Sequence, residues 1–231
     1  MGKIVAMGGG FGGDDGIELM KYIFELSGKE KPNYLQIPTA GYDMPDIGSL
    51  AAHARWGCET DILYLTHAYI TEEIVAEKIR KADIIYVPGG NLKFLADWWK
   101  KTKADKYLKE AFDDGKVLFG SSSGSMCWFK QGFDDCAPLG EFMFVDVLGI
   151  IPYNNVPHYE GAFWQTFNEW ASKTPLSTIA CENNTALCYI DGKYSIKIAS
   201  DRPDARVWFF DAEDGYKRYD LRQHPEILER L

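Results

Sequence analysis

Short apolar runs alternate with longer amphipathic stretches through the first half of the chain. Runs that are apolar at successive positions and rich in Val, Ile and Leu are typical of strands buried on both faces. The stretches between them repeat apolar positions every three or four residues, which is typical of helices. This order predicts an α/β fold in which helices cover both faces of a parallel sheet. The expected strands cover residues 3–7, 33–37, 60–65, 82–87 and 116–120, and the expected helices cover 17–27, 46–57 and a segment beginning after Thr71.

The second half of the chain has a different pattern. A helix is expected at 161–173. Two strand-like runs at 186–190 and 193–198 flank Asp191 and Gly192, a dipeptide typical of a two-residue β-hairpin. A run at 206–210 predicts another antiparallel strand. Because no repeat or long linker divides the chain, we expect a single α/β domain over residues 1–231, with an antiparallel extension on its sheet.

Composition and charge narrow the class of protein. The chain has 231 residues, enough to bury one sizeable core. A formal net charge of −9 argues against nucleic acid and anionic membrane surfaces as partners. No run approaches the roughly 18 apolar residues of a membrane span. The five cysteines are scattered and lack a paired spacing, which favours reduced thiols in a cytoplasmic protein over disulfides or a metal site.

Four of the expected strands are followed by loops with small or polar residues. Ligands of open α/β sheets bind beyond the carboxyl ends of the strands, and glycines let the backbone approach them closely. The first loop lacks the spacing of a dinucleotide fingerprint and has no phosphate-binding lysine, so no nucleotide cofactor is expected. The loops are GGGFGG (8–13), PTAGYD (38–43), PGGN (88–91) and SSSGS (121–125).

Residues 120–124, GSSSG, fit the pattern G-x-S-x-G with Ser122 at its centre. A strand-like run precedes them and a helical stretch follows, which is the context of a nucleophile elbow. The alternative is an ordinary loop in which Ser122 or Ser123 caps the next helix. Cys127 is a weaker candidate nucleophile, because it lies well inside the expected helix and is typical of a small buried apolar residue.

A serine nucleophile needs a base and a group that orients the base. Of the four histidines, His158 follows a strand-like run and is the best candidate base. Glu182 is a candidate orienting acid, and Asp134 and Asp135 are rivals. The spacing does not separate Glu182 from Asp135. Glu160 lies too near His158 in sequence to reach round its ring.

Backbone donors for an oxyanion are expected in two places. The pair Gly89 and Gly90 offers free N–H groups between a strand and a helix. The N–H of Ser123, the residue after the candidate nucleophile, is the natural second donor. Gly89 and Asn91 are also expected to border the substrate.

Together these motifs resemble the peptidase E family of serine peptidases (dipeptidase E, alpha-aspartyl dipeptidase), to which cyanophycinase is related. The resemblance implies a three-layer α/β/α sandwich similar to class I glutamine amidotransferases, with a mainly parallel central sheet. It also implies that Ser122 is the nucleophile, His158 the base and Glu182 the orienting acid, with Gly90 and Ser123 in the oxyanion hole. The matching segments are VPGGN (87–91), FGSSSGSMCWF (119–129), GIIPYNNVPHYEG (149–161) and CENNTALCYIDGKY (181–194).

The resemblance implies hydrolysis of small peptides, including dipeptides, through an acyl-enzyme and without a metal or organic cofactor. One departure concerns specificity. The aspartyl dipeptidases recognise an N-terminal aspartate with arginines downstream of the histidine, whereas Lys173 is the only cation between His158 and Glu182 here. An unpaired carboxylate in a closed cleft is costly, so Asp-X specificity is not expected.

The aromatic residues after His158 are candidates for the substrate pocket. Tyr159 and Trp164 are expected to contact substrate, whereas Phe163 and Phe167 also fit the buried face of a helix. Two other functions remain open from the sequence. One is a hydrolase of an ester or a non-peptide amide, and the other is a non-catalytic ligand-binding protein on the same scaffold. The sequence is compatible with a monomer or a homodimer.

Overall fold

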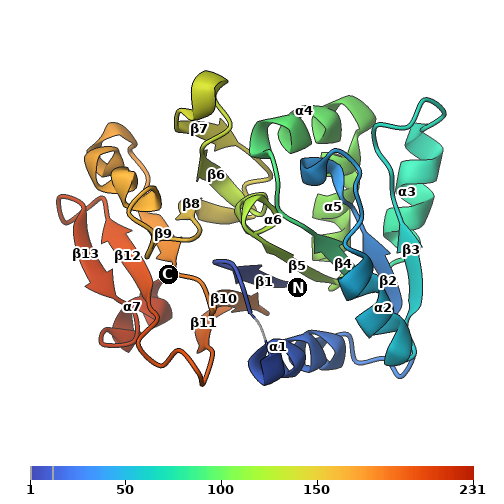
Figure 1. Ribbon diagram of the computed structural model, residues 1–231, viewed down its shortest axis with the longest axis horizontal. Coiled ribbons are helices and arrows are strands. Elements are labelled where there is room, and N and C mark those ends of the chain that lie inside the picture. The colour runs from blue at the N-terminus through green and yellow to red at the C-terminus, as the bar shows by residue number, and fades with distance from the viewer. Residues whose placement is uncertain (1, 12) are drawn as a thin grey trace.

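The computed structural model describes residues 2–11 and 13–231, and its central feature is a seven-stranded sheet (Figure 1). The strand order is β11-β10-β1-β5-β4-β2-β3. The five strands of the first half pair in parallel, and a hairpin adds two antiparallel strands beside β1, as the sequence predicted. The strands are β1 (Lys3–Met7), β2 (Asn33–Gln36), β3 (Glu59–Ile62), β4 (Ile84–Val87), β5 (Val117–Ser121), β10 (Thr185–Ile190) and β11 (Lys193–Ile198).

Helices cover both faces of this sheet because successive side chains of a strand point to opposite faces. Ile4 and Ala6 of β1 pack in the core on the side of α3, α4 and α5, whereas Val5 and Met7 pack on the side of α1. The expected three-layer arrangement is confirmed. The helices are α1 (Gly13–Leu26), α2 (Ile47–Arg55), α3 (Glu72–Lys81), α4 (Leu92–Thr102), α5 (Ala104–Asp113), α6 (Ser123–Met126) and α7 (Pro225–Arg230).

A second sheet of six strands, in the order β13-β12-β9-β8-β6-β7, was not expected from the sequence. The helix expected after residue 122 is only the short α6, because the fully buried residues 127–129 lead directly into β6. The run at 206–210 joins this second sheet and does not extend the first. The strands are β6 (Phe129–Asp134), β7 (Met143–Asp146), β8 (Ile151–Val156), β9 (Thr178–Cys181), β12 (Val207–Asp211) and β13 (Lys217–Asp220).

The helix expected at 161–173 is instead two 3₁₀ segments, η3 (Trp164–Glu169) and η4 (Ala171–Lys173). Phe167 and Ala171 are buried in a cluster with Phe133 and Phe210 of the second sheet. The packing of these bulky rings outweighs the local preference for an α-helix. The two segments therefore cover one face of the second sheet, beside the carboxyl end of β8.

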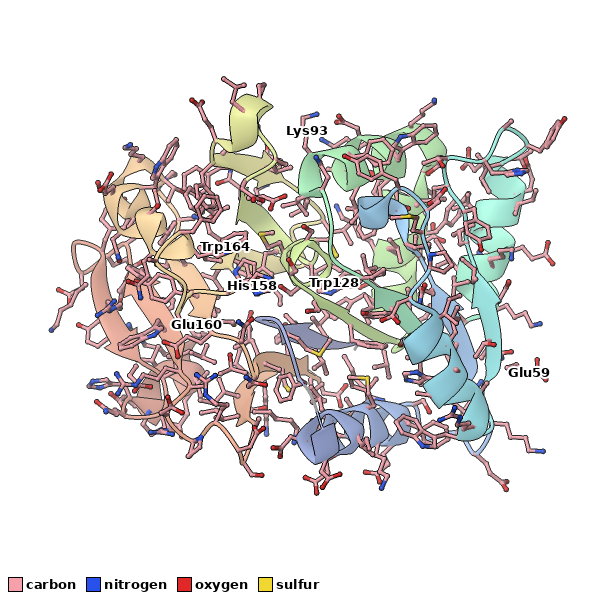
Figure 2. All side chains as sticks on the ribbon, viewed as in Figure 1. Glu59, Lys93, Trp128, His158, Glu160 and Trp164 are labelled. Atoms are coloured by element: carbon pink, nitrogen blue, oxygen red, sulfur yellow. The ribbon has the colours of Figure 1, made fainter. Side chains whose placement is uncertain are left out.

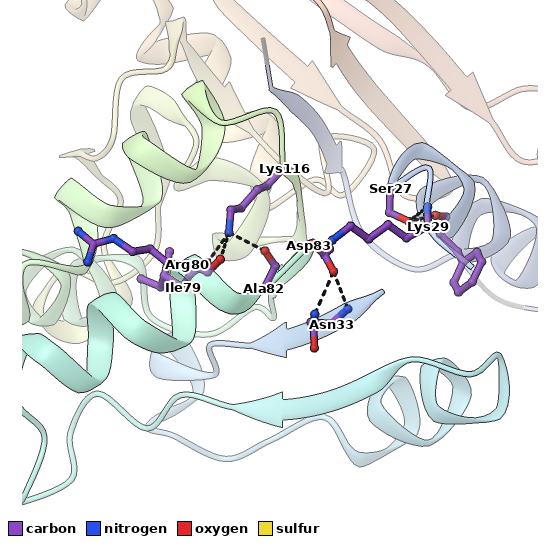
Figure 3. Close-up of polar contacts among 9 residues, drawn as sticks. Ser27, Lys29, Asn33, Ile79, Arg80, Ala82, Asp83 and Lys116 are labelled. Carbon is purple, nitrogen blue, oxygen red and sulfur yellow. Dashed lines mark hydrogen bonds and ion pairs between the residues drawn. The ribbon is translucent and has the colours of Figure 1, made fainter. Parts of the chain in front are cut away.

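At the amino ends of the parallel strands, charged side chains form hydrogen bonds with neighbouring backbone and side-chain groups (Figure 3). Lys116, just before β5, donates from Nζ to the carbonyls of Ile79 and Ala82 at 3.0 and 2.7 Å, and also to that of Arg80. Asp83, just before β4, accepts from Lys29 and from both the backbone and the side chain of Asn33. Burial alone would raise the pKa of Asp83, but these hydrogen bonds lower it below its ordinary value.

Candidate active site

Ser122 follows β5 directly and has an unusual backbone conformation, with φ 58° and ψ −126°. A positive φ is costly for a residue with a Cβ, so the surroundings must hold it. The Ser122 N–H donates to the Met7 carbonyl at 3.4 Å. The Ser122 carbonyl accepts from the N–H groups of Ser125 and Met126 at 2.8 and 3.1 Å, and from Ser125 Oγ at 2.7 Å. This is the sharp strand-to-helix turn that the G-x-S-x-G pattern predicts.

The loop after β4 lies against this turn. A Cβ on Gly89 would lie 2.9 Å from Ser122 Cβ. Gly90 has φ +148°, and a Cβ there would lie 2.1 Å from the Ala40 carbonyl oxygen, so only glycine fits. Ser123 Oγ donates to the Gly90 carbonyl at 2.6 Å and ties this loop to the turn.

Two backbone donors are free at this junction. Within residues 2–11 and 13–231, neither the Gly90 N–H nor the Ser123 N–H has an acceptor. Free N–H groups beside a serine hydroxyl can stabilise an oxyanion. Asn91 has another role, since its Oδ1 accepts from the Phe94 N–H at 2.8 Å and caps α4.

His158 comes from the second sheet, two residues after β8, and also has a positive φ of 53°. Its N–H donates to the Gly8 carbonyl at 2.9 Å. Its ring lies so close to Gly9 that a Cβ there would be 2.4 Å from Cε1 and Nδ1. Figure 2 shows His158 near the centre of the molecule, beside Trp164. Since Ser122 is bonded to Met7 and His158 to Gly8, the end of β1 brings the two residues to the same region.

The two side chains are not joined by a hydrogen bond in the described structure, where Ser122 Oγ has no partner. Such contacts are often long in the absence of substrate and tighten in the reacting complex. The other histidines lie elsewhere. His53 is buried between α2 and the sheet, His67 follows β3, and His224 precedes α7.

The hydrogen-bond partner of the His158 ring is Asn183. His158 Nδ1 lies 2.7 Å from Asn183 Oδ1. Glu160 fixes the amide, because its Oε2 accepts from the Asn183 N–H at 2.8 Å and its Oε1 accepts from Asn183 Nδ2. A carboxylate accepts only, so the amide nitrogen must face Glu160 and the amide oxygen must face His158. Nδ1 of His158 therefore carries the proton, and Nε2 has the lone pair that a base requires.

The expected contact between Glu182 and His158 is not formed. Glu182 Oε2 accepts from the Arg206 N–H at 3.0 Å, and Oε1 accepts from Trp208 Nε1 at 2.9 Å. The carboxylate is thus held against β12. The side chain that bonds to His158 is instead that of Asn183, the next residue in the same ENNT segment. Glu160, expected to lie too near His158 to reach round its ring, bonds to Asn183 and does not need to reach round it.

The rival carboxylates are also placed away from His158. Asp134 is buried, and its Oδ2 accepts from the Leu92 N–H at 2.9 Å, which helps to cap α4. Burial raises the pKa of Asp134 to about 6. Asp135 is exposed. Cys127 is fully buried, and burial raises the pKa of its thiol well above the ordinary value, which disfavours the nucleophilic thiolate.

The aromatic residues after His158 divide into two groups. Tyr159 is only 1% exposed, and its hydroxyl bonds to Asn168 at 2.7 Å, so it belongs to the core and not to the substrate surface as predicted. Phe167 is also buried. Trp164 lies beside the His158 ring, with 5.4 Å between ring centroids, and Phe163 is 53% exposed. Of these four residues, Trp164 and Phe163 are the two that are at least partly exposed.

Sequence comparison finds relatives of this chain that are named as peptidases. The chain is 30% identical over 216 residues to the uncharacterized peptidase YgaJ of Bacillus subtilis (strain 168), covering 90% of this chain and 91% of that protein. It is also 30% identical over 129 residues to the uncharacterized peptidase Lmo0363 of Listeria monocytogenes, covering 52% of this chain and 62% of the relative.

The fold is also found in solved structures. A peptidase from an acI-B1 Actinobacterium superposes with a TM-score of 0.74 at 21% identity, covering 95% of this chain and 94% of the other. The family model of peptidase family S51 matches residues 4–197, which include the turn at Ser122, the loop at Gly89 and Gly90, and the histidine network of His158, Asn183 and Glu160. The chain is a member of peptidase family S51, and the predicted relationship to peptidase E is confirmed.

Proposed function

We propose that this protein hydrolyses small peptides, dipeptides among them, through an acyl-enzyme formed on Ser122. The observation that carries the proposal is the strained turn at Ser122, which lies beside two backbone N–H groups that have no acceptor among the described residues. Strain in such a turn is kept where function requires it. Membership of a peptidase family supplies the reaction class.

The chemical steps follow from the roles of the residues. His158 Nε2 takes the proton of Ser122 Oγ as the oxygen attacks the peptide carbonyl carbon. The N–H groups of Gly90 and Ser123 hold the negative oxygen of the tetrahedral intermediate. The protonated His158 then gives its proton to the leaving amine as the C–N bond breaks. Water gives a proton to His158 as it attacks the acyl-enzyme carbonyl, and His158 returns that proton to Ser122 Oγ as the ester C–O bond breaks.

Asn183 takes the orienting role in this proposal, in place of Glu182. Its amide oxygen accepts from His158 Nδ1 and so selects the tautomer with a basic Nε2. A neutral amide stabilises the imidazolium less than a carboxylate would. Glu160 is hydrogen-bonded to the N–H groups of Asn183, so its negative charge acts on His158 through Asn183 and not by direct contact.

The first test is turnover of a dipeptide library by wild type and Ser122→Ala. The kcat/KM of the variant should fall at least about a thousandfold, because the nucleophilic hydroxyl is gone. A fluorophosphonate probe should label wild-type Ser122 and leave the variant unlabelled. Peptide turnover by Ser122→Ala at the wild-type rate would refute the proposal.

The second test separates the two candidate orienting residues. Asn183→Ala should lower kcat by about a hundredfold or more, because His158 loses the bond that fixes its tautomer. Glu182→Gln, its matched control one position away, should retain most of the activity. The reverse result would return the orienting role to Glu182. Thermal unfolding of both variants separates lost catalysis from lost folding.

A non-catalytic ligand-binding protein is the second candidate, because Ser122 Oγ has no hydrogen bond to His158 in the described residues. In that case Ser122 would be no more reactive than an ordinary serine. Absence of fluorophosphonate labelling, together with peptide binding without hydrolysis, would favour this function. Rapid labelling without peptide cleavage would indicate an ester or another amide as the substrate.

A further inference from the structure

A cavity of about 470 Å³ lies between the sheet and the helices α1 and α2. Phe11 and Met20 line it from the side of α1, Trp56 lines it just after α2, and Tyr86 and Phe119 form its floor on β4 and β5. Cavities of this size and apolar character are typical of small-molecule sites. Figure 1 shows α1 and α2 on the same side of the sheet.

The cavity adjoins the proposed active site on two sides. Ser121, which lines the cavity, directly precedes Ser122. Gly10 also lines it and directly follows Gly9, which lies against the ring of His158. A peptide bound at Ser122 would therefore lie next to the cavity, because the residue before Ser122 lines it.

The charges around the cavity exclude one class of side chain. No Lys or Arg is among the described residues that line it. Asp46 is the one acidic residue among the described residues of the lining, and it caps α2 by accepting from the Ser49 N–H at 3.0 Å. A carboxylate placed in this cavity would have no cation to pair with, and that is costly.

The histidine in the wall does not supply a positive charge. His53 is fully buried and stacks on Tyr34, with ring centroids 4.0 Å apart. Its Nδ1 lies 2.8 Å from the Ser49 carbonyl, which only accepts, so Nδ1 carries the proton. Burial lowers the pKa of His53 and keeps the ring neutral near pH 7. His53 is thus part of an aromatic wall.

We propose that the cavity between α1 and α2 is the specificity pocket and that it takes a large apolar or aromatic side chain next to the scissile bond. The inference rests on the proposed peptidase function. It makes aromatic dipeptides better substrates than Asp-X dipeptides, because burial of an apolar ring is favourable and burial of an unpaired carboxylate is not.

The test uses a cavity-filling substitution with a control on the same helix. Ala52 lines the cavity, whereas Ala54 is exposed and does not. Wild type should cleave Phe-Ala or Ala-Phe at least about tenfold better in kcat/KM than both Asp-Ala and Ala-Ala. Ala52→Phe should abolish most of this preference, and Ala54→Phe should keep it. An equal preference in all three proteins, or no aromatic preference in wild type, would overturn the inference.

Binding to the Ser122→Ala protein separates this inference from the proposed function. Calorimetry with Phe-Ala, Ala-Phe and Asp-Ala should show tighter binding of an aromatic dipeptide, and the added Ala52→Phe substitution should remove the difference. Loss of turnover in Ser122→Ala without an aromatic preference in binding would refute the pocket and leave the peptidase. Retained turnover would refute the peptidase mechanism, and the calorimetry would still decide the pocket.

Discussion

At the amino ends of β4 and β5, Asp83 and Lys116 each receive or make several hydrogen bonds (Figure 3). At the carboxyl ends of the same strands, two N–H groups are unpaired among the described residues, and Ser122 has a positive φ. Neither Lys116 nor Asp83 has a positive φ. One edge of the sheet thus contributes stability, and the other gives up stability for groups that can bind a reacting carbonyl.

Gly9→Ala should have the largest effect of the four substitutions, and the effect should be on activity at the carboxyl edge of the sheet. The new Cβ would lie 2.1 Å from Asn183 Oδ1 and 2.4 Å from the His158 ring, so both side chains must move. A misplacement of about 1 Å can cost about a hundredfold in rate, and kcat should fall by at least that amount. Steady-state kinetics on a dipeptide substrate would measure it. Unchanged kcat would mean that His158 does not act from this position.

Lys116→Met should affect the opposite edge alone. It removes the cation from three carbonyls at the end of α3 while keeping most of the apolar stem. The free energy of unfolding should fall by about 1–3 kcal/mol, and kcat/KM at a temperature well below unfolding should not change. Urea unfolding measures the first quantity. A loss of activity without a loss of stability would show that the two edges are not independent.

Ser123→Ala should have a smaller effect, confined to the carboxyl edge. The backbone donor remains, but Gly90 loses the hydroxyl that holds its carbonyl at 2.6 Å. We expect kcat to fall by about tenfold, less than the loss of an oxyanion donor itself, with little change in KM. Ser123→Thr retains a hydroxyl and should restore part of the rate if its methyl group fits. A fall in KM and kcat by the same factor would indicate a different role.

The smallest expected effect is the pH dependence contributed by Asp83. Its pKa is lowered in the folded protein, so its contribution to stability is fully present above its ordinary pKa of 3.8 and is lost as the pH falls through the lowered value. The contribution should be below about 1 kcal/mol, because the ion pair with Lys29 is partly exposed. Melting temperatures of wild type and Asp83→Asn should therefore converge as the pH falls below the ordinary pKa of 3.8 and through the lowered value. A constant difference would contradict this assignment.

The sequence predicted the parallel strands well, because runs such as residues 3–7 and 84–87 are apolar on both faces. It also predicted the hairpin, since Asp191 and Gly192 specify the turn. The second sheet was missed because β6 and β8 are interrupted by polar residues, such as Asn154 and Asn155, that are buried by pairing with other side chains and backbone groups.

The candidate site was predicted in part for a similar reason. Ser122 stands in a local pattern, and the pattern alone indicates its turn. The partner of His158 depends on how β8 and β9 pair, and one position in ENNT decides whether Glu182 or Asn183 faces the ring. Local sequence does not specify that register, because it is set by the pairing of two separate strands within the second sheet.

The position of β1 has a consequence for biosynthesis. β1 pairs with β5 and β10, and the loop after it contacts His158 and Asn183. At about 5–20 residues per second, roughly 10–35 s separate the synthesis of Met7 from that of Ala186, its partner in β10. During that interval β1 lacks one neighbour and the histidine network is absent. A ribosome-bound chain stalled before residue 183 should therefore not react with a fluorophosphonate. Ser122 would become a reactive nucleophile only after Asn183 and β10 have been synthesised.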